Sequence, residues 1–161
     1  MSLDSVKAEL ARIAPDIEVL EHETSTATVA LAAAVHGVEP GQIAKTLSLR
    51  VGETVLLVVV RGDARLDNRK ARAAFGGKAR MLGADEVEAI TGHPVGGVCP
   101  FGLASPLLVH CDVSLKIYDE VVPAAGSTHS SLRIAPDRMA ALTNAVWVDV
   151  CELREVEAAA P

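Results

Sequence analysis

Aromatic side chains are scarce in this sequence, whose 161 residues include two phenylalanines, one tyrosine and one tryptophan. The formal net charge at pH 7 is -6. Proteins that follow a nucleic-acid backbone along a broad groove need many basic side chains, and proteins that stack bases need several aromatic rings. We therefore expect that any nucleic acid bound by this protein is contacted only locally.

Long apolar runs are also missing. There is no uninterrupted stretch of about 18 apolar residues, and no basic segment followed by an apolar one, as in a secretory signal. Cys99, Cys111 and Cys151 are odd in number and far apart, which favours free thiols in a reducing compartment over a disulfide framework. These features predict a soluble cytoplasmic protein that does not associate with a membrane.

Hydrophobic residues make up 50% of the chain, and neither an internal repeat nor a Pro/Gly/Ser-rich linker divides it. A chain of this length can bury about two thirds of its unfolded surface in one core. We therefore predict a single domain over residues 1–161. Only the low-complexity tail, residues 154–161, is expected to be flexible.

Capping residues, glycine stops and proline starts predict helices over residues 5–13, 27–36, 67–77, 84–92 and 136–144. The expected N-caps of the second and third of these helices are Thr26 and Asp67. Apolar alternation and continuous apolar runs predict strands over residues 17–21, 45–51, 54–60, 106–113, 120–126, 130–136 and 145–150. Residues 54–60 are apolar on both faces, as a central strand requires. This order indicates an α+β fold with a mixed, largely antiparallel, curved and barrel-like sheet flanked by helices.

Lys45 lies in the segment "KTLSLRV", where alternation places it in phase with Leu47, Leu49 and Val51. Its aliphatic stem could simply follow the core while the amine reaches solvent. If the amine instead ends in a pocket, burial lowers its pKa unless an anion offsets the cost, so a phosphate or developing oxyanion is a suitable partner. Lys45 is therefore a candidate electrostatic clamp.

Residues 92–104, "GHPVGGVCPFGLA", form a glycine- and proline-rich loop. Glycine and proline are common in purely structural turns. Consecutive glycines such as Gly96 and Gly97 also allow backbone N–H groups to converge on a ligand, as an oxyanion hole requires. Pro100 would keep the loop in one shape.

Cys99 in this loop, with His93 six residues earlier, gives a second hypothesis, a cysteine nucleophile. The segment "AAGSTHSS" contains Gly126, Ser127 and His129, which form either a turn or part of a pocket wall. No HxxxH, HExxH or CxxC spacing and no Walker or GxGxxG motif is present. The sequence thus predicts neither a metal nor a cofactor.

Taken in order, the segments "GVEPGQIAKTL", "VVRGDARLDNRKA", "TGHPVGGVCPFGL" and "AAGSTHSSLRI" resemble the YbaK family, which includes the insertion-type editing domains of prolyl-tRNA synthetase. The resemblance spans nearly the whole chain. Its most specific parts are Ala-Lys-Thr-Leu at 44–47 and Gly-Gly-x-x-Pro-x-Gly at 96–102. It implies an aminoacyl-tRNA deacylase that acts in trans and hydrolyses the ester bond of mischarged tRNA without metal.

The resemblance also implies roles for individual residues. Catalytic roles fall to Lys45, Gly96 and Gly97, and substrate contacts to Thr46, Val98, Cys99, Pro100, Gly126, Ser127 and His129. Thr46 stands where some members have asparagine, and Cys99 stands where many have a small hydroxyl residue, so both are expected to affect amino-acid specificity. The implied partners are the aminoacylated 3′ end of tRNA and a synthetase such as prolyl-tRNA synthetase.

The expected mechanism is attack of water on the ester, with loop amides stabilising the oxyanion. Lys45 would hold the terminal phosphate or the carbonyl end, and the adjacent ribose hydroxyl would assist proton transfer. Two alternatives belong to other classes: a catalytically silent module that binds aminoacyl or nucleotide ligands, and a hydrolase that depends on Cys99.

Overall fold

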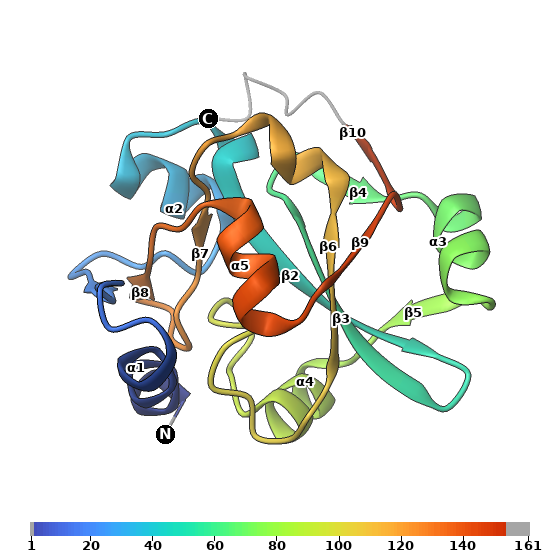
Figure 1. Cartoon of the computed structure of the whole chain (residues 1–161), viewed down its shortest axis with the longest axis horizontal. Coiled ribbons are helices and arrows are strands. Elements are labelled where there is room, and N and C mark those ends of the chain that lie inside the picture. Colours follow the sequence, from blue (N-terminus) through green and yellow to red (C-terminus); the bar gives the residue numbers. More distant parts are fainter. Residues whose placement is uncertain (1, 154–161) are drawn as a thin grey trace.

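The computed structural model describes residues 2–153 and is built around a six-stranded sheet with helices on both faces (Figure 1). The sheet has the strand order β5 (Ala79–Met81), β2 (Ile43–Val51), β3 (Thr54–Arg61), β6 (Leu108–Asp112), β9 (Val146–Val148), and β7 (Val122–Pro123) also pairs with β2. Two small sheets are formed by β1 (Leu20–Glu21) with β8 (Ser130–Ser131), and by β4 (Ala64–Leu66) with β10 (Cys151–Leu153). The predicted flexible tail, residues 154–161, lies outside the described residues.

The mixed α+β architecture is confirmed, but the main sheet is less antiparallel than the sequence predicted. β2 is antiparallel to β3 and β5, whereas the β2–β7, β3–β6 and β6–β9 pairs are parallel. Parallel neighbours need long crossover connections. Here α3 (Asn68–Phe75) and α4 (Ala84–Thr91) lie between β3 and β6, and α5 (Pro136–Thr143) lies between β6 and β9. The sheet ends at β5 and β9 and does not close into a barrel.

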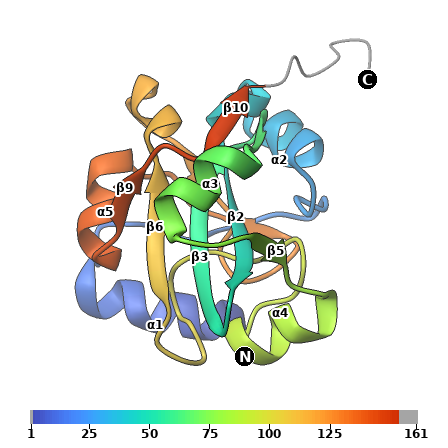
Figure 2. The same ribbon diagram turned by 90° about the vertical axis from the view of Figure 1, so that its right-hand side faces the viewer.

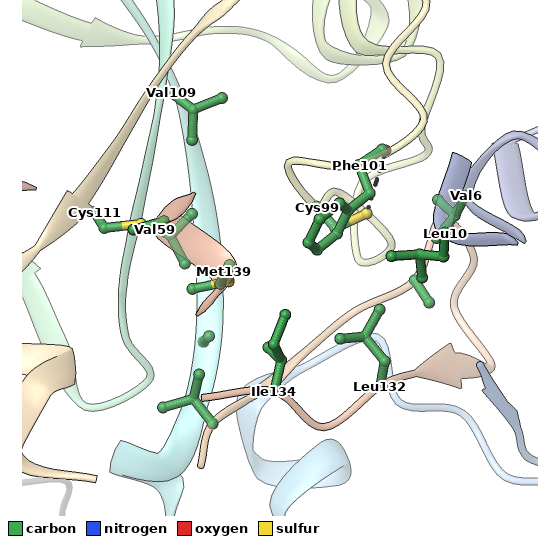
Figure 3. Close-up of a cluster of buried hydrophobic side chains, with 14 of the residues drawn as sticks. Val6, Leu10, Val59, Cys99, Phe101, Val109, Cys111, Leu132, Ile134 and Met139 are labelled. Carbon is green, nitrogen blue, oxygen red and sulfur yellow. Dashed lines mark hydrogen bonds between the residues drawn. The ribbon is translucent and has the colours of Figure 1, made fainter. Parts of the chain in front are cut away.

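β3 is the central strand, as predicted, because its side chains are buried on both faces. Leu57 and Val59 pack with α1 (Ser2–Ile13), α5 and Phe101 in one apolar cluster (Figure 3). Val58 and Val60 pack on the opposite face against α3, β4 and β10. Figure 2 shows α3 covering that second face. Apolar burial on this scale is the main stabilising contribution to the fold.

Local capping explains where α2 (Val29–His36) begins and ends. Its N-cap is Thr28, whose side chain accepts from the Leu31 amide, and Gly37 ends it with φ 66°. The predicted cap, Thr26, is wrong, because its hydroxyl donates to the Thr128 carbonyl at 3.2 Å instead. Asp67 caps α3 as predicted. Two 3-10 helices, η1 (Pro40–Gln42) and η2 (Val113–Ile117), complete the described elements, and within residues 2–153 no helix has the length and apolarity to cross a membrane.

Candidate active site

A gap in strand pairing opens along one edge of β2. On this edge β7 pairs with Ile43 and Ala44, and β5 pairs with residues 49–51. Between them, the Ser48 carbonyl accepts from the Leu82 amide at 3.0 Å. Backbone groups of alternate residues point to the same edge, so those of Thr46 also face the gap. An unpaired strand edge inside a sheet is a natural ligand site because its polar groups need partners.

A cavity of about 390 Å³ occupies this gap. Its wall is largely apolar and comes from the start of α2, the end of β5, α4, β7 and the loop after α4: Val29, Ala32, Met81, Leu82, Val87, Val95, Val98, Val122 and Pro123. The size and lining are typical of a small-molecule site. The cavity can therefore hold a small, mostly apolar group.

Lys45 is the one ionisable side chain among the described residues that line the cavity. It is half-buried and makes no ion pair within residues 2–153. Burial lowers the pKa of its ammonium group below the ordinary value, and the nearby Cys151 and Asp63 partly offset this effect. A half-buried ammonium without a counter-ion is well suited to an anionic ligand.

The loop after α4 supplies backbone donors at the cavity. Gly96, with φ 91°, and Val98 line it, and their amide N–H groups have no partner within the described chain. The Gly97 amide instead donates to the Pro94 carbonyl at 2.9 Å. Two further polar groups of lining residues, Thr46 Oγ1 and Ser48 Oγ, are buried and have no hydrogen-bond partner among residues 2–153. The site thus combines a cation, unpaired donors and an apolar wall.

Comparison with known proteins assigns the chain to a family. The model of the aminoacyl-tRNA editing domain matches residues 23–142. The chain belongs to this family. It is 47% identical over 154 residues to the uncharacterized protein YwhH of Bacillus subtilis, covering 94% of this chain and 98% of that one.

Two further relatives carry functional descriptions. A candidate Cys-tRNA(Pro)/Cys-tRNA(Cys) deacylase, EbsC of Enterococcus faecalis, is 30% identical over 117 residues, which are 71% of each chain. The crystal structure of a candidate trans-editing enzyme for prolyl tRNA synthetase superposes with a TM-score of 0.87 at 36% identity, covering 94% of this chain and 97% of that chain. The resemblance predicted from the sequence motifs is therefore confirmed at the level of the family.

The editing-domain cavity includes four of the residues singled out from the sequence: Lys45, Thr46, Gly96 and Val98. Gly97 lies behind this wall. Its carbonyl accepts from the Gly126 amide at 2.9 Å, and a Cβ atom at Gly97 would lie 2.7 Å from the Ser127 nitrogen. Gly97 therefore lets two loops pack closely, while Gly96 and Val98 line the cavity with amides that have no partner within residues 2–153.

Cys99 does not line the cavity, contrary to the sequence-based expectation of a substrate contact. Its side chain is fully buried and points into the cluster of Phe101, Val6 and Leu10 (Figure 3). Burial raises the pKa of its thiol to about 12. His93 Nε2 lies 3.8 Å from the sulfur but donates to the Phe101 carbonyl at 2.7 Å, so it is not placed to take the thiol proton.

The remaining predicted contacts also lie outside the cavity lining. Pro100 is buried in the core beside Cys99, where it shapes the loop. Gly126 packs against the start of α1, where its carbonyl accepts from the Ser2 hydroxyl. The Ser127 hydroxyl bonds to Ser130 Oγ at 2.6 Å, and His129 is exposed with its Nδ1 2.9 Å from Thr128 Oγ1. Gly126, Ser127 and His129 belong to the turn before β8, and Pro100 belongs to the loop after α4. None of the four lines the cavity.

Sequence reasoning missed a buried serine held by two histidines. Ser131 lines the cavity, and its Oγ lies 2.7 Å from His22 Nε2 and 2.6 Å from His36 Nε2. Burial, followed by the charge of Arg133, lowers the pKa of His36. No sequence spacing signals this cluster, because the β1–β8 pairing brings together residues more than a hundred positions apart.

Proposed function

We propose that this protein hydrolyses the ester bond between a mischarged amino acid and the 3′ end of its tRNA, acting as a separate editing protein. One observation carries the proposal. Lys45, whose ammonium forms no ion pair within residues 2–153, lines one largely apolar cavity together with Gly96 and Val98, whose amides have no partner in the same part of the chain. An aminoacylated terminal nucleotide carries a phosphate, an ester carbonyl and an amino-acid side chain, and these three groups match the cation, the amide donors and the apolar wall.

In the proposed mechanism the amino-acid side chain occupies the apolar end of the cavity, beside Ala32 and Val122. The amides of Gly96 and Val98 donate to the ester carbonyl oxygen and stabilise the oxyanion that forms when water attacks. Lys45 binds the phosphate of the terminal nucleotide. The unpaired backbone edge at Thr46 would hold the substrate's amino group or ribose hydroxyl.

The proton acceptor in this scheme comes from the substrate. Among the described residues that line the cavity there is no carboxylate and no imidazole. The vicinal hydroxyl of the terminal ribose lies next to the ester in any aminoacylated tRNA. It can relay the proton of the attacking water to the ribose oxygen that leaves when the bond between the carbonyl carbon and that oxygen breaks, so that a free amino acid and a free tRNA 3′ end are released. The reaction so drawn uses no metal, because the ammonium and the amides provide the electrostatic stabilisation.

The proposed partners are the aminoacylated tRNA end and prolyl-tRNA synthetase. The relation to prolyl-tRNA synthetase rests on the solved structure described as a candidate trans-editing enzyme for that synthetase.

The test is a deacylation panel in which purified protein is incubated with tRNAs carrying different amino acids. We expect release of one or a few amino acids at rates that Lys45→Ala reduces strongly. A protein that binds mischarged tRNA without releasing any amino acid would support the silent binding module instead. Lys70→Ala is a matched control, since Lys70 is paired with Asp149 at 3.1 Å outside the cavity.

A further inference from the structure

Basic side chains are concentrated in one short part of this acidic protein. Of its 15 lysines and arginines, seven lie between residues 61 and 80. Three of the seven are neutralised in ion pairs, Arg61 with Asp63, Arg65 with Glu152 and Lys70 with Asp149. The other four form no ion pair within residues 2–153: Arg69, Arg72, Lys78 and Arg80.

Three of these unpaired cations surround a shallow depression between α3 and β5. It has a volume of about 360 Å³ and is lined by Asn68, Arg69, Arg72, Lys78 and Ala79. Figure 2 shows α3 and β5 next to each other on the same side of the molecule. We call this surface, made by Asn68, Arg69, Arg72 and Lys78, the α3–β5 basic face.

The basic face does not stabilise the fold through charge pairing. Arg69 and Arg72 are three residues apart on one helix face, a spacing at which like charges repel. All three cations are exposed and form no ion pair within residues 2–153, while Arg69 also acts through its charge on the carboxylate of Asp67, the N-cap of α3. A polyanionic ligand would remove this repulsion.

The basic face is continuous with the candidate active site through β5. Ala79 lines the depression and Met81, two residues further along the same strand, lines the cavity. Two residues of strand span about 7 Å, which is about the rise of two nucleotides along one stacked strand. A single nucleic-acid strand whose terminal nucleotide enters the cavity can therefore place its preceding phosphates next to Arg72 and Lys78.

The charges on either side of β5 also favour one direction for a bound nucleic-acid strand. On the other side of β5, α4 carries the exposed carboxylates Asp85, Glu86 and Glu88, of which Glu86 is paired with Arg50. Phosphates are repelled from α4 and attracted to α3. The net charge of -6 and the local basic face are compatible, because only a few phosphates next to the reacting end need to be held.

We propose that the α3–β5 basic face binds the phosphate backbone of the tRNA acceptor end and guides its 3′ terminus over β5 into the cavity. This inference rests on the proposed deacylase function. It adds a second, electrostatic binding site that contributes affinity for tRNA and does not take part in the hydrolysis step.

The test compares two double charge reversals with equal change in net charge. Arg69→Glu/Arg72→Glu alters the basic face, and Arg12→Glu/Lys116→Glu is the matched control with exposed cations on α1 and η2. Each protein is assayed on full-length aminoacyl-tRNA and on the same amino acid esterified to adenosine, which lacks the acceptor-stem phosphates. Melting temperatures establish that the variants are folded.

The basic-face variant should lose about 10-fold in kcat/KM on tRNA at about 150 mM salt, through KM, and its salt slope should fall by about 2. Its rate on the adenosine ester should stay at the wild-type value. The control variant should keep both activities. Equal losses on both substrates, no loss on tRNA, or an equal loss in the control variant would each overturn the proposed face.

A binding measurement separates this inference from the proposed function. A fluorescent acceptor-stem hairpin is titrated into Lys45→Ala protein with and without the basic-face reversal. Weaker binding after the reversal supports the face even if the wild-type protein releases no amino acid, an outcome that would overturn the deacylase function alone. Unchanged hairpin affinity would overturn the face and leave the deacylase function standing.

Discussion

Lys45 shows how one residue can serve the site without serving the core. It shares a face of β2 with Leu47, Leu49 and Val51, which pack in the apolar cluster under α3, yet it lines the cavity and its ammonium forms no ion pair within residues 2–153. Keeping an unpaired cation half-buried costs free energy. A ligand that supplies the missing charge is the physical reason for such a residue.

Lys45→Ala should therefore reduce deacylation without destabilising the protein. We expect a loss of at least about 100-fold in kcat/KM, because without the phosphate contact the ester is no longer held in position against the loop amides. The melting temperature should stay the same or rise, because the variant no longer buries an unpaired charge. Turnover at the wild-type level would remove Lys45 from the mechanism.

Cys99→Ser should affect stability rather than the choice of amino acid. Its sulfur lies in the apolar cluster and donates to the Phe101 carbonyl at 3.5 Å, so a serine there keeps an acceptor but buries a more polar group with fewer apolar contacts, which costs about 1–3 kcal/mol. For a domain of this size each kcal/mol lowers the melting temperature by about 2–4 °C. The variant should keep the wild-type pattern in the deacylation panel; complete loss of turnover in a folded Cys99→Ser protein would restore the nucleophile hypothesis.

His93 should make the fold sensitive to acid. Burial lowers the pKa of this imidazole below its ordinary value of 6.5. Its Nε2–H donates to the Phe101 carbonyl, and its buried Nδ1 has no hydrogen-bond partner in the described part of the chain. A proton added at Nδ1 would therefore be buried without an acceptor. Since the unfolded chain binds a proton more readily, stability is fully present above about pH 6.5 and is lost as the pH falls toward the folded pKa.

The measurement is the melting temperature between pH 7.5 and pH 5.5, for the wild type and for His93→Gln. The glutamine keeps a donor for Phe101 but does not titrate, so its melting temperature should fall less over this range. His36 and His110, whose pKa values burial also lowers, add to the acid sensitivity with the same sign in both proteins. An equal fall in wild type and variant would exclude His93 as a source.

At the scale of elements, the site depends on the loop after α4 being held against the turn before β8. The Gly126 amide bonds to the Gly97 carbonyl, and the Thr26 amide bonds to the Thr128 carbonyl at 2.7 Å. These contacts fix the loop beside α2 and β2. The free amides of Gly96 and Val98 are therefore presented by a braced loop, as preorganised donors should be.

Gly97→Ala should impair turnover even though Gly97 presents no donor to the cavity. Its Cβ would lie 2.7–2.9 Å from backbone atoms of Ser127, which cannot move aside as a flexible side chain could. We expect a stability cost of about 1–3 kcal/mol and a fall in kcat from displaced amides. The comparison is Gly83→Ala, where a Cβ meets nothing within 4 Å and both quantities should stay near the wild type.

At the scale of the whole molecule, the chemistry is expected to need no metal. Residues 2–153 contain no group of three or more His, Cys, Asp or Glu side chains that could hold an ion. We predict that deacylation survives prolonged treatment with EDTA. Activity that is lost to the chelator and restored by zinc would contradict the mechanism built on Lys45 and the loop amides.

Much of this architecture follows from the sequence because it depends on local patterns. The two-sided apolar run of β3 identified the central strand, and glycine stops identified the ends of α2, α3 and α4. β4, β5 and β10 were not predicted, because each spans only three residues, too short for a periodic signal. The parallel pairings were missed because strand partners are chosen by contacts far apart in the chain.

The sequence by itself determined the family and the α+β class, and its motifs predicted Lys45, Thr46, Gly96 and Val98, all of which line the cavity. Only the tertiary structure decided which side of the loop faces the cavity, so that Cys99 points into the core while Gly96 and Val98 present free amides. It also decided that Ser131 meets His22 and His36, and that Arg69, Arg72 and Lys78 share one depression. The physical reason is that side-chain direction and long-range pairing are set by packing across the whole domain, which no local pattern encodes.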